Sequence, residues 1–284
     1  MQPLFEHRLK LAGYETRVLE LEGEGPPIVF LHGWADSADT WRMVLDRLAR
    51  GDRRAIAVDL PGFGTASRLM SGQVLPQLER FARAAVEYVA PGGGALVAGN
   101  SLGGSVAMRL AQRRDVELAG VVPIAPAGLD MARWFVLVER DPILRFLLAA
   151  PVPLPAPVFR RAVGELYRRL AFARPGAVDE RVIEAFASHL SSRSDVARRL
   201  AIGRQLLPEL RDPFDLERIS CSVLLVWGSK DLLVFQTGAQ RVVNGVENGR
   251  MELIEDCGHC PQLEAPERFT ELLLDFPAGL ARTA

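Results

Sequence analysis

The chain has 284 residues, of which 49% are hydrophobic and 24% are charged, and its formal net charge is -1. This balance is typical of a folded globular domain, and it excludes a disordered chain and the basic surface of a nucleic-acid-binding protein. Only Lys10 and Lys230 among the 34 basic residues are lysines, and we predict no nucleic-acid partner. The length predicts one large core with an insertion.

The N-terminus and the most apolar stretch indicate where in the cell the protein is expected to be. The first ten residues carry charges at Glu6, Arg8 and Lys10 and no apolar run, so we predict a cytoplasmic protein. Residues 144–159 form the most apolar stretch, but it contains several prolines and is shorter than the roughly 20 residues of a membrane span. We therefore predict no membrane span. The cysteines are too few for a disulfide framework.

The first hundred residues alternate predicted strands and helices. Residues 5–11 and 14–21 alternate apolar and polar side chains on either side of a turn, which predicts an antiparallel hairpin at a sheet edge. The next predicted elements are buried strands at 28–31, 55–58 and 95–98, with helices at 40–50 and 75–89. A glycine-rich breaker precedes the strand at 95–98.

A short turn follows that strand and leads directly into a helix that starts at Leu102. The turn reads Gly99-Asn100-Ser101-Leu102-Gly103, which is the Gly-x-Ser-x-Gly pattern of a nucleophile elbow. In such a turn the serine hydroxyl is exposed at the edge of a sheet, and the glycines leave room for the sharp bend. The alternative is a glycine-rich turn with an incidental serine. A histidine and an acid at suitable positions later in the chain would favour the nucleophile elbow.

The remaining elements continue the alternation. Strands are predicted at 121–125, 222–227 and 251–254, and helices at 238–246 and 261–276. Repeated strand-helix alternation predicts an α/β fold with a mainly parallel sheet, helices on both faces and right-handed crossovers.

The segment between the strands at 121–125 and 222–227 is too long for a simple crossover. It contains predicted helices at 131–139, 142–150, 158–171, 179–188 and 195–207. We therefore predict a core formed by residues 1–128 and 214–284 and an inserted helical cap, or lid, formed by residues 129–213.

The predicted cap has an apolar and a basic side. Its apolar residues Trp134, Phe135 and Phe146, together with His32 after an early strand, are expected to line the substrate pocket. Its arginines are expected to form a solvated face, which leaves room for an acidic group on the substrate; they are Arg160, Arg161, Arg168, Arg169, Arg198 and Arg199.

A serine nucleophile requires a histidine base, which in turn requires an acid to orient it. Of the four histidines, His259 follows the last predicted strand, on the edge of the sheet that carries the elbow. Asp231 follows the preceding strand and falls on the same edge. The order Ser101, Asp231, His259 is the order expected for this kind of elbow, so we predict these residues as a catalytic triad.

Two other acids, Asp130 and Asp256, lie close in sequence to predicted strand ends. Asp130 follows the strand at 121–125 and is an alternative acid. Asp256 is too close to His259 in sequence to turn onto its ring. Backbone N–H groups of Leu102 and Trp34 are the predicted donors of an oxyanion hole, because Leu102 starts a helix and Trp34 lies in a loop after a buried strand.

Together these segments resemble the α/β-hydrolase superfamily over almost the whole chain outside the cap. The motifs that carry the resemblance are His32-Gly33-Trp34, Asp59-Leu60-Pro61-Gly62-Phe63-Gly64, Gly99-Asn100-Ser101-Leu102-Gly103-Gly104, Trp227-Gly228-Ser229-Lys230-Asp231 and Gly258-His259-Cys260-Pro261. The resemblance implies an eight-stranded sheet with a lid and the triad of Ser101, Asp231 and His259. It says little about the substrate.

The chain differs from several branches of that superfamily, and these differences disfavour the reactions that those branches catalyse. Haloalkane dehalogenases and epoxide hydrolases have Asp at the elbow, where this chain has Ser101, and the cap has only Tyr167 where epoxide hydrolases use two tyrosines. Proline iminopeptidases have a different elbow sequence. The Asn100-Ser101 pair is similar to that of hydrolases that cleave carbon–carbon bonds in ring-fission products, but those have a Trp where this chain has Leu263.

Two further motifs have alternative interpretations. Cys257-Gly258-His259-Cys260 matches a dithiol redox motif, but it follows a late strand and is unlike the early thioredoxin placement. The glycines of residues 59–64 could hold a phosphate, but no Gly-Lys-Ser/Thr follows them. We predict no metal and no cofactor.

The sequence therefore predicts a cofactor-independent serine hydrolase that cleaves small-molecule carboxylic esters with apolar acyl or alcohol groups. A carbon–carbon bond hydrolase of ring-fission diketo acids is the alternative, followed by a non-catalytic ligand-binding protein of the same fold. Residue patterns alone do not predict the oligomeric state.

Overall fold

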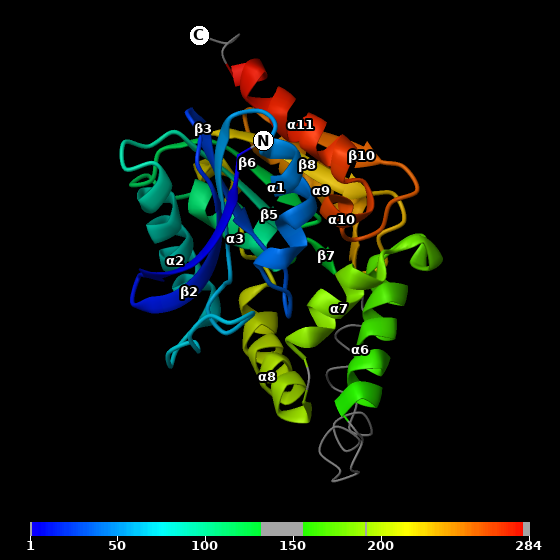
Figure 1. Ribbon diagram of the computed structural model, residues 1–284. Helices are drawn as coiled ribbons and strands as arrows, with labels where there is room; N and C mark the ends of the chain where they lie inside the picture. The colour runs from blue at the N-terminus through cyan, green and yellow to red at the C-terminus, as the bar shows by residue number, and fades with distance from the viewer. Residues whose placement is uncertain (1, 132–155, 191, 281–284) are drawn as a thin grey trace.

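The computed structural model describes residues 2–131, 156–190 and 192–280 (Figure 1). Its centre is an eight-stranded sheet in the order β1-β2-β4-β3-β5-β6-β8-β10. The strands are β1 (Leu4–Leu11), β2 (Tyr14–Leu21), β3 (Gly25–Leu31), β4 (Arg53–Val58), β5 (Ala95–Asn100), β6 (Leu118–Ile124), β8 (Ser222–Gly228) and β10 (Gly249–Ile254). All neighbours from β4 to β10 are parallel, whereas β2 runs antiparallel to β1 and β4. The predicted mainly parallel sheet and edge hairpin are confirmed.

Helices cover both faces of this sheet, and they are α1 (Arg42–Leu48), α2 (Val74–Val89), α3 (Leu102–Ala111), α9 (Ala239–Gly245), α10 (Pro261–Glu264) and α11 (Pro266–Leu280). Side chains of α1 and α11, such as Leu45 and Phe269, form one buried cluster with one face of the strands. Side chains of α2, α3 and α9 form the cluster on the other face. Each central strand is therefore buried on both sides, which explains its continuous apolar sequence.

Two helices differ from their predicted ranges. The helix predicted at 40–50 starts as a 3-10 turn, η1 (Ala38–Trp41), at which Ser37 Oγ accepts from the Asp39 N–H. The helix predicted at 261–276 is divided between α10 and α11. The division falls at Ala265 because the following residue, Pro266, disfavours helical backbone in the residue before it.

In the predicted cap the structure describes α6 (Ala156–Ala171), α7 (Glu180–Ser188) and α8 (Arg193–Glu209), which match three of the expected helices. The helices predicted at 131–139 and 142–150 fall almost entirely outside the described residues. Residues Asp130–Met131 form β7, which pairs with β9 (Val234–Phe235) in a small antiparallel sheet. That pairing was not predicted, because two residues are too few to show a periodic pattern.

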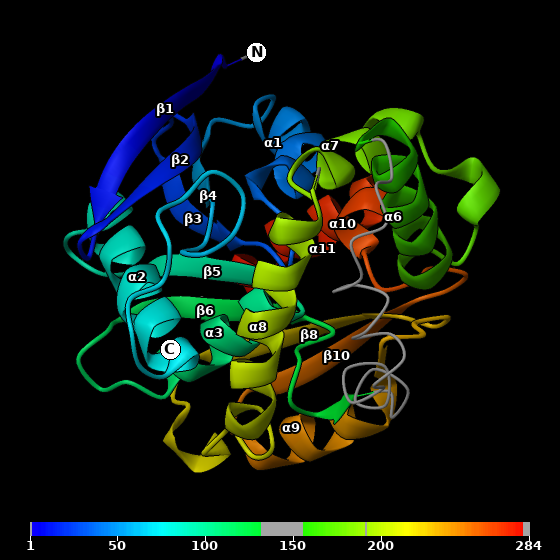
Figure 2. The same cartoon turned by 90° about the horizontal axis from the view of Figure 1, so that it is seen from below.

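Helices α6, α7 and α8, which belong to the predicted cap, lie together on one side of the sheet in Figure 1. Seen from that side in Figure 2, α8 passes across the ends of β5 and β6, where the elbow lies. In the described part of the chain, no helix has the length and apolar character needed to cross a membrane.

One prediction about the cap arginines is wrong. Arg160, Arg161 and Arg169 are exposed as expected, but Arg199 is only 4% exposed. Arg199 belongs to the inner face of α8, because the buried residues Ile202, Gly203 and Leu206 follow it at helical spacing. Adjacent residues on a helix point in different directions, so Arg198 stays half-exposed while Arg199 lies on the packed face.

Candidate active site

The candidate nucleophile lies in a strained turn between β5 and α3. Ser101 has φ 54° and ψ -112°, a positive-φ conformation that residues other than glycine rarely adopt. Its backbone is held by hydrogen bonds from the Ser101 N–H to Ile124 O (2.8 Å) and from the Ala127 N–H to Ser101 O (3.1 Å). Strain that the surrounding structure maintains in this way is characteristic of functional sites.

The glycines of the elbow are required by close backbone approach. A Cβ placed on Gly103 would lie 2.2 Å from Leu31 O, and one on Gly99 would lie 2.3 Å from Gly103 O. No side-chain adjustment relieves these clashes because the opposing atoms belong to the backbone. The bend that presents Ser101 therefore depends on both glycines, as the sequence pattern predicts.

The candidate acid and base are hydrogen-bonded to each other. Asp231 Oδ2 lies 2.7 Å from His259 Nδ1, and both side chains are buried. The other carboxylate oxygen, Asp231 Oδ1, accepts from the N–H groups of Leu233 (2.7 Å) and Val234 (3.1 Å). Because Oδ1 is held by the backbone, Oδ2 is left to orient the imidazole ring.

His259 is also connected to the elbow. The side-chain amide of Asn100, the residue before the candidate nucleophile, donates to His259 O at 2.9 Å. Segments that are 159 residues apart in sequence are thereby brought to one edge of the sheet. This arrangement supports His259 as the base that serves Ser101.

The alternative acids are used elsewhere. Asp130 is exposed in β7, and its carboxylate accepts from the hydroxyl of Thr237. Asp256 is exposed in the turn before His259. The pairing with Asp231 therefore leaves neither of them a role in orienting His259.

His32 was expected to line the pocket, but its environment indicates a different role. It is fully buried, its Nδ1 lies 2.7 Å from Gly33 O, and its Nε2 accepts from the Leu60 N–H at 2.8 Å. Burial lowers the pKa of His32 to about 4, so the ring is neutral. With both ring nitrogens bonded to backbone, His32 joins two loops at the sheet edge instead of contacting a substrate.

The loop after His32 lies against the elbow. A Cβ placed on Gly33 would lie 3.4 Å from Ser101 Cβ, so the segment containing Trp34 lies next to the candidate nucleophile. Leu102 is the first residue of α3, and its N–H has no acceptor within the helix. These positions support the backbone N–H groups of Trp34 and Leu102 as donors to an oxyanion.

The end of α6 is bonded directly to the His259 loop. The His259 N–H donates to Ala171 O at 2.7 Å. Glu264 then accepts three backbone hydrogen bonds, from Gly258 (2.7 Å) in the His259 loop and from Ala173 (3.2 Å) and Arg174 (3.0 Å) after α6. The Glu264 carboxylate therefore couples the segment after α6 to the candidate base, and no sequence signal had singled it out.

We expect Glu264→Gln to destabilise the protein by about 1–3 kcal/mol, because an amide NH₂ would face N–H donors that now point at carboxylate oxygens. Ester hydrolysis should also slow as the His259 loop loosens. Urea unfolding and steady-state kinetics measure the two effects. The exposed Glu271, which pairs with Arg268, provides the matched control Glu271→Gln. Equal effects of the two substitutions would contradict a coupling role for Glu264.

The surroundings of residues 257–260 and 59–64 do not favour the redox and phosphate-binding interpretations of these two motifs. Burial raises the pKa of the thiols of Cys257 and Cys260, which disfavours the thiolates that redox chemistry needs. The loop of residues 59–64 closes around a carboxylate rather than leaving room for a phosphate. A Cβ on Gly64 would lie 2.4 Å from Asp59 Cγ, and Asp59 accepts from Arg17 and from backbone N–H groups.

The remaining predicted pocket residues, Trp134, Phe135 and Phe146, lie outside the described residues. Within the described part, no three His, Cys, Asp or Glu side chains are grouped as metal ligands would be.

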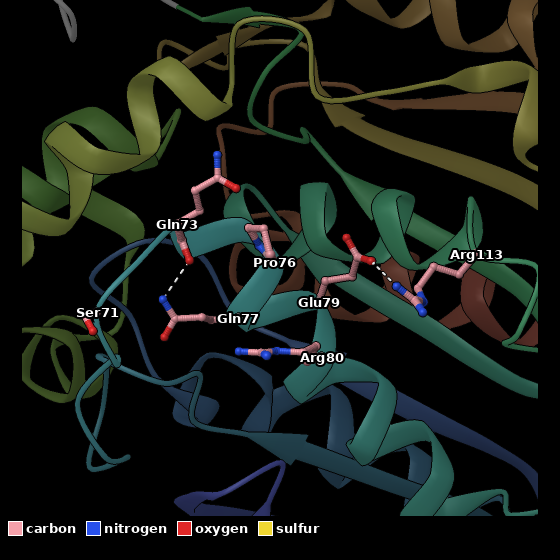
Figure 3. A pocket seen from close by; sticks show the side chains of 7 residues that line it. All are labelled: Ser71, Gln73, Pro76, Gln77, Glu79, Arg80 and Arg113. Carbon is pink, nitrogen blue, oxygen red and sulfur yellow. Dashed lines mark hydrogen bonds and ion pairs between the residues drawn. The ribbon is translucent and has the colours of Figure 1, made fainter.

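A cavity of about 320 Å³ lies away from this site, beside α2 (Figure 3). Two contacts join residues of its lining: the Gln77 amide donates to Gln73 O, and Glu79 pairs with Arg113. The cavity is lined by Ser71, Gln73, Pro76, Gln77, Glu79, Arg80 and Arg113, and it contains no paired nucleophile and base.

Comparison with known proteins agrees with this fold. Residues 28–272 match the model of the Alpha/beta hydrolase family. The chain is 30% identical to a pimeloyl-[acyl-carrier protein] methyl ester esterase from Nitrosomonas europaea, over 88% of this chain and 95% of that protein. It is 24% identical to human monoacylglycerol lipase ABHD6, over 92% of this chain and 78% of the lipase.

Solved structures show the same architecture. The 2-hydroxy-6-oxo-6-phenylhexa-2,4-dienoate hydrolase of Rhodococcus sp. strain RHA1 superposes with a TM-score of 0.76 at 19% identity. The superposition covers 97% of this chain and 99% of that one. At this level of identity the likeness concerns the fold alone.

Proposed function

Because the chain belongs to the alpha/beta hydrolase family, we propose that it is a serine hydrolase that cleaves small-molecule carboxylic esters with apolar acyl or alcohol groups. The observation that carries the proposal is the Asp231–His259 hydrogen bond of 2.7 Å, at the sheet edge where Ser101 occupies a strained turn. The relatives whose names describe an ester esterase and a lipase support the same reaction class.

The proposed reaction proceeds through an acyl-enzyme. Ser101 Oγ attacks the ester carbonyl while His259 Nε2 takes the hydroxyl proton, and Asp231 stabilises the imidazolium that forms. The N–H groups of Leu102 and Trp34 bind the oxyanion, an interaction worth about 3–4 kcal/mol per donor in favourable cases. The proton then passes from His259 to the departing alcohol. Water, deprotonated by the same imidazole, hydrolyses the acyl-serine and regenerates Ser101.

Residues 129–213 are proposed as a lid over this site. Two hydrogen bonds support that assignment: the His259 N–H donates to Ala171 O, and Trp34 Nε1 donates to Arg199 O. Each bond joins a helix of the proposed lid to a loop of the candidate site. A lid that is bonded to both loops would exclude water when a substrate is bound.

Labelling with a fluorophosphonate probe tests the nucleophile assignment directly. We expect the folded protein to be modified at Ser101, as located by peptide mass spectrometry, and to hydrolyse p-nitrophenyl acyl esters. Failure to label the folded protein would instead indicate a non-catalytic binding protein. Turnover of a vinylogous diketo acid with negligible ester hydrolysis would indicate the carbon–carbon bond hydrolase.

A further inference from the structure

The guanidinium of Arg199 is buried without a full set of partners. Its side chain is 5% exposed, and neither Nε nor Nη1 has a hydrogen-bond partner among the described residues. Buried polar groups in native proteins are almost always hydrogen-bonded, so such an exception requires a physical explanation. Burying a cation without adequate pairing also costs free energy, and here burial lowers the pKa of Arg199.

Asp195, the nearest carboxylate among the described residues, is committed to other groups. Its Oδ1 is 3.8 Å from Arg199 Nη1, beyond hydrogen-bond distance. The same oxygen accepts from Arg198 Nη2 at 3.2 Å, and Oδ2 accepts from the N–H and hydroxyl of Ser192 in the capping box of α8. The first turn of α8 is therefore held by Asp195, and among the described residues no acceptor binds Nε or Nη1 of Arg199.

Arg199 lies beside the candidate oxyanion loop. Its carbonyl oxygen accepts from Trp34 Nε1 at 3.1 Å, and one turn later a Cβ on Gly203 would lie 3.4 Å from the same nitrogen. The inner face of α8 is thus in contact with the residue whose backbone N–H is proposed to bind the oxyanion. Figure 2 shows this helix crossing the end of the sheet that carries Ser101.

The planar guanidinium of Arg199 has several N–H donors, and it therefore matches an acceptor with two oxygens, such as a carboxylate. A carboxylate carries one negative charge at neutral pH, which balances the one charge of Arg199, whereas a phosphate monoester carries nearly two. We propose that Arg199 binds a free carboxylate on the substrate, so that the protein hydrolyses esters of acids that also carry a second, ionised carboxyl group. This inference rests on the proposed ester hydrolysis.

Half-esters of straight-chain dicarboxylic acids, in a series of increasing length, test the inference against neutral methyl esters of matched length. Arg199→Gln should lower kcat/KM for the best half-ester by about 10- to 100-fold, the value of a hydrogen-bonded charge, and change the neutral ester by less than about threefold. The matched control is Arg198→Gln, since Arg198 is half-exposed and the substitution removes the same charge one residue away. The control should leave both activities unchanged.

Binding by the inactive Ser101→Ala protein provides a readout that does not depend on turnover. Calorimetric titration with the free dicarboxylic acid should show binding that Arg199→Gln weakens by the same factor. If no ester is hydrolysed but the dicarboxylate still binds through Arg199, the proposed reaction fails and the subsite stands. Preference for inorganic phosphate over the dicarboxylate would overturn the carboxylate assignment.

Thermal unfolding separates binding from a structural role. Because Arg199 is buried without full pairing, Arg199→Gln should leave the unfolding midpoint unchanged or raise it. Equal losses on charged and neutral esters, together with a lower midpoint, would mean that Arg199 supports the fold, and the inference would be wrong.

Discussion

Ser101→Ala is expected to lower kcat/KM for p-nitrophenyl acyl esters by about 10⁴-fold or more, because the acyl-enzyme cannot form without the hydroxyl. The remaining rate would come from the oxyanion donors and the binding site alone. The fold should survive, since the Ser101 backbone is held by Ile124 and Ala127 and alanine tolerates the turn no worse than serine does. Stopped-flow and steady-state assays together with circular dichroism measure both outcomes.

Ser71→Ala is the matched control for this substitution. Ser71 is an exposed serine at the cavity beside α2, away from the elbow, and its replacement should leave ester hydrolysis unchanged (Figure 3). Retained turnover in Ser101→Ala would remove the nucleophile assignment. Loss of turnover in Ser71→Ala would move the active site to the α2 cavity.

Asp231→Asn is expected to lower kcat by about 10³- to 10⁴-fold with little change in stability. The two N–H groups of Leu233 and Val234 determine which atom of the amide is oxygen, so the NH₂ group must face His259 Nδ1. A donor at that position forces the ring to carry its proton on Nε2, where it cannot accept the proton of Ser101. Ester hydrolysis measured over a range of pH gives the change in kcat, and thermal unfolding gives the change in stability.

Asp130→Asn distinguishes this tautomer effect from a general loss of charge near the sheet edge. Asp130 bonds Thr237 on the surface, and its replacement should change kcat less than about twofold. If Asp130→Asn were the damaging substitution and Asp231→Asn were mild, the acid of the proposed triad would have to be reassigned.

Much of the fold could be predicted because the relevant signals are local. The strands β3, β4, β5 and β8 are buried on both faces and read as continuous apolar runs. The elbow was recognisable because its bend leaves no space for a Cβ at Gly99 or Gly103, and only glycine meets that condition. Candidate site residues were identified because they directly follow parallel strands, whose carboxyl ends share one edge.

Interactions between distant segments could not be predicted in the same way. The bond from Ala173 to Glu264 joins residues 91 positions apart, and neither position has a distinctive sequence pattern. His32 follows a core strand, as a pocket residue would, but the nearby Leu60 N–H and Gly33 O occupy its ring. Arg199 lies next to the half-exposed Arg198 in sequence, and it is buried because it occupies the face of α8 that packs inward with Ile202, Gly203 and Leu206.

The sequence by itself therefore determined the mainly parallel α/β sheet, the order of strands and helices along the chain, and the residue types at the ends of the strands. These follow from side-chain periodicity and backbone sterics, which act between near neighbours. Tertiary structure decided which oxygen of Asp231 faces His259, which backbone groups Glu264 binds, and which of the adjacent arginines of α8 is buried. Those outcomes depend on hydrogen bonds and desolvation between segments that meet only in the folded chain, as Trp34 and Arg199 do across 165 residues.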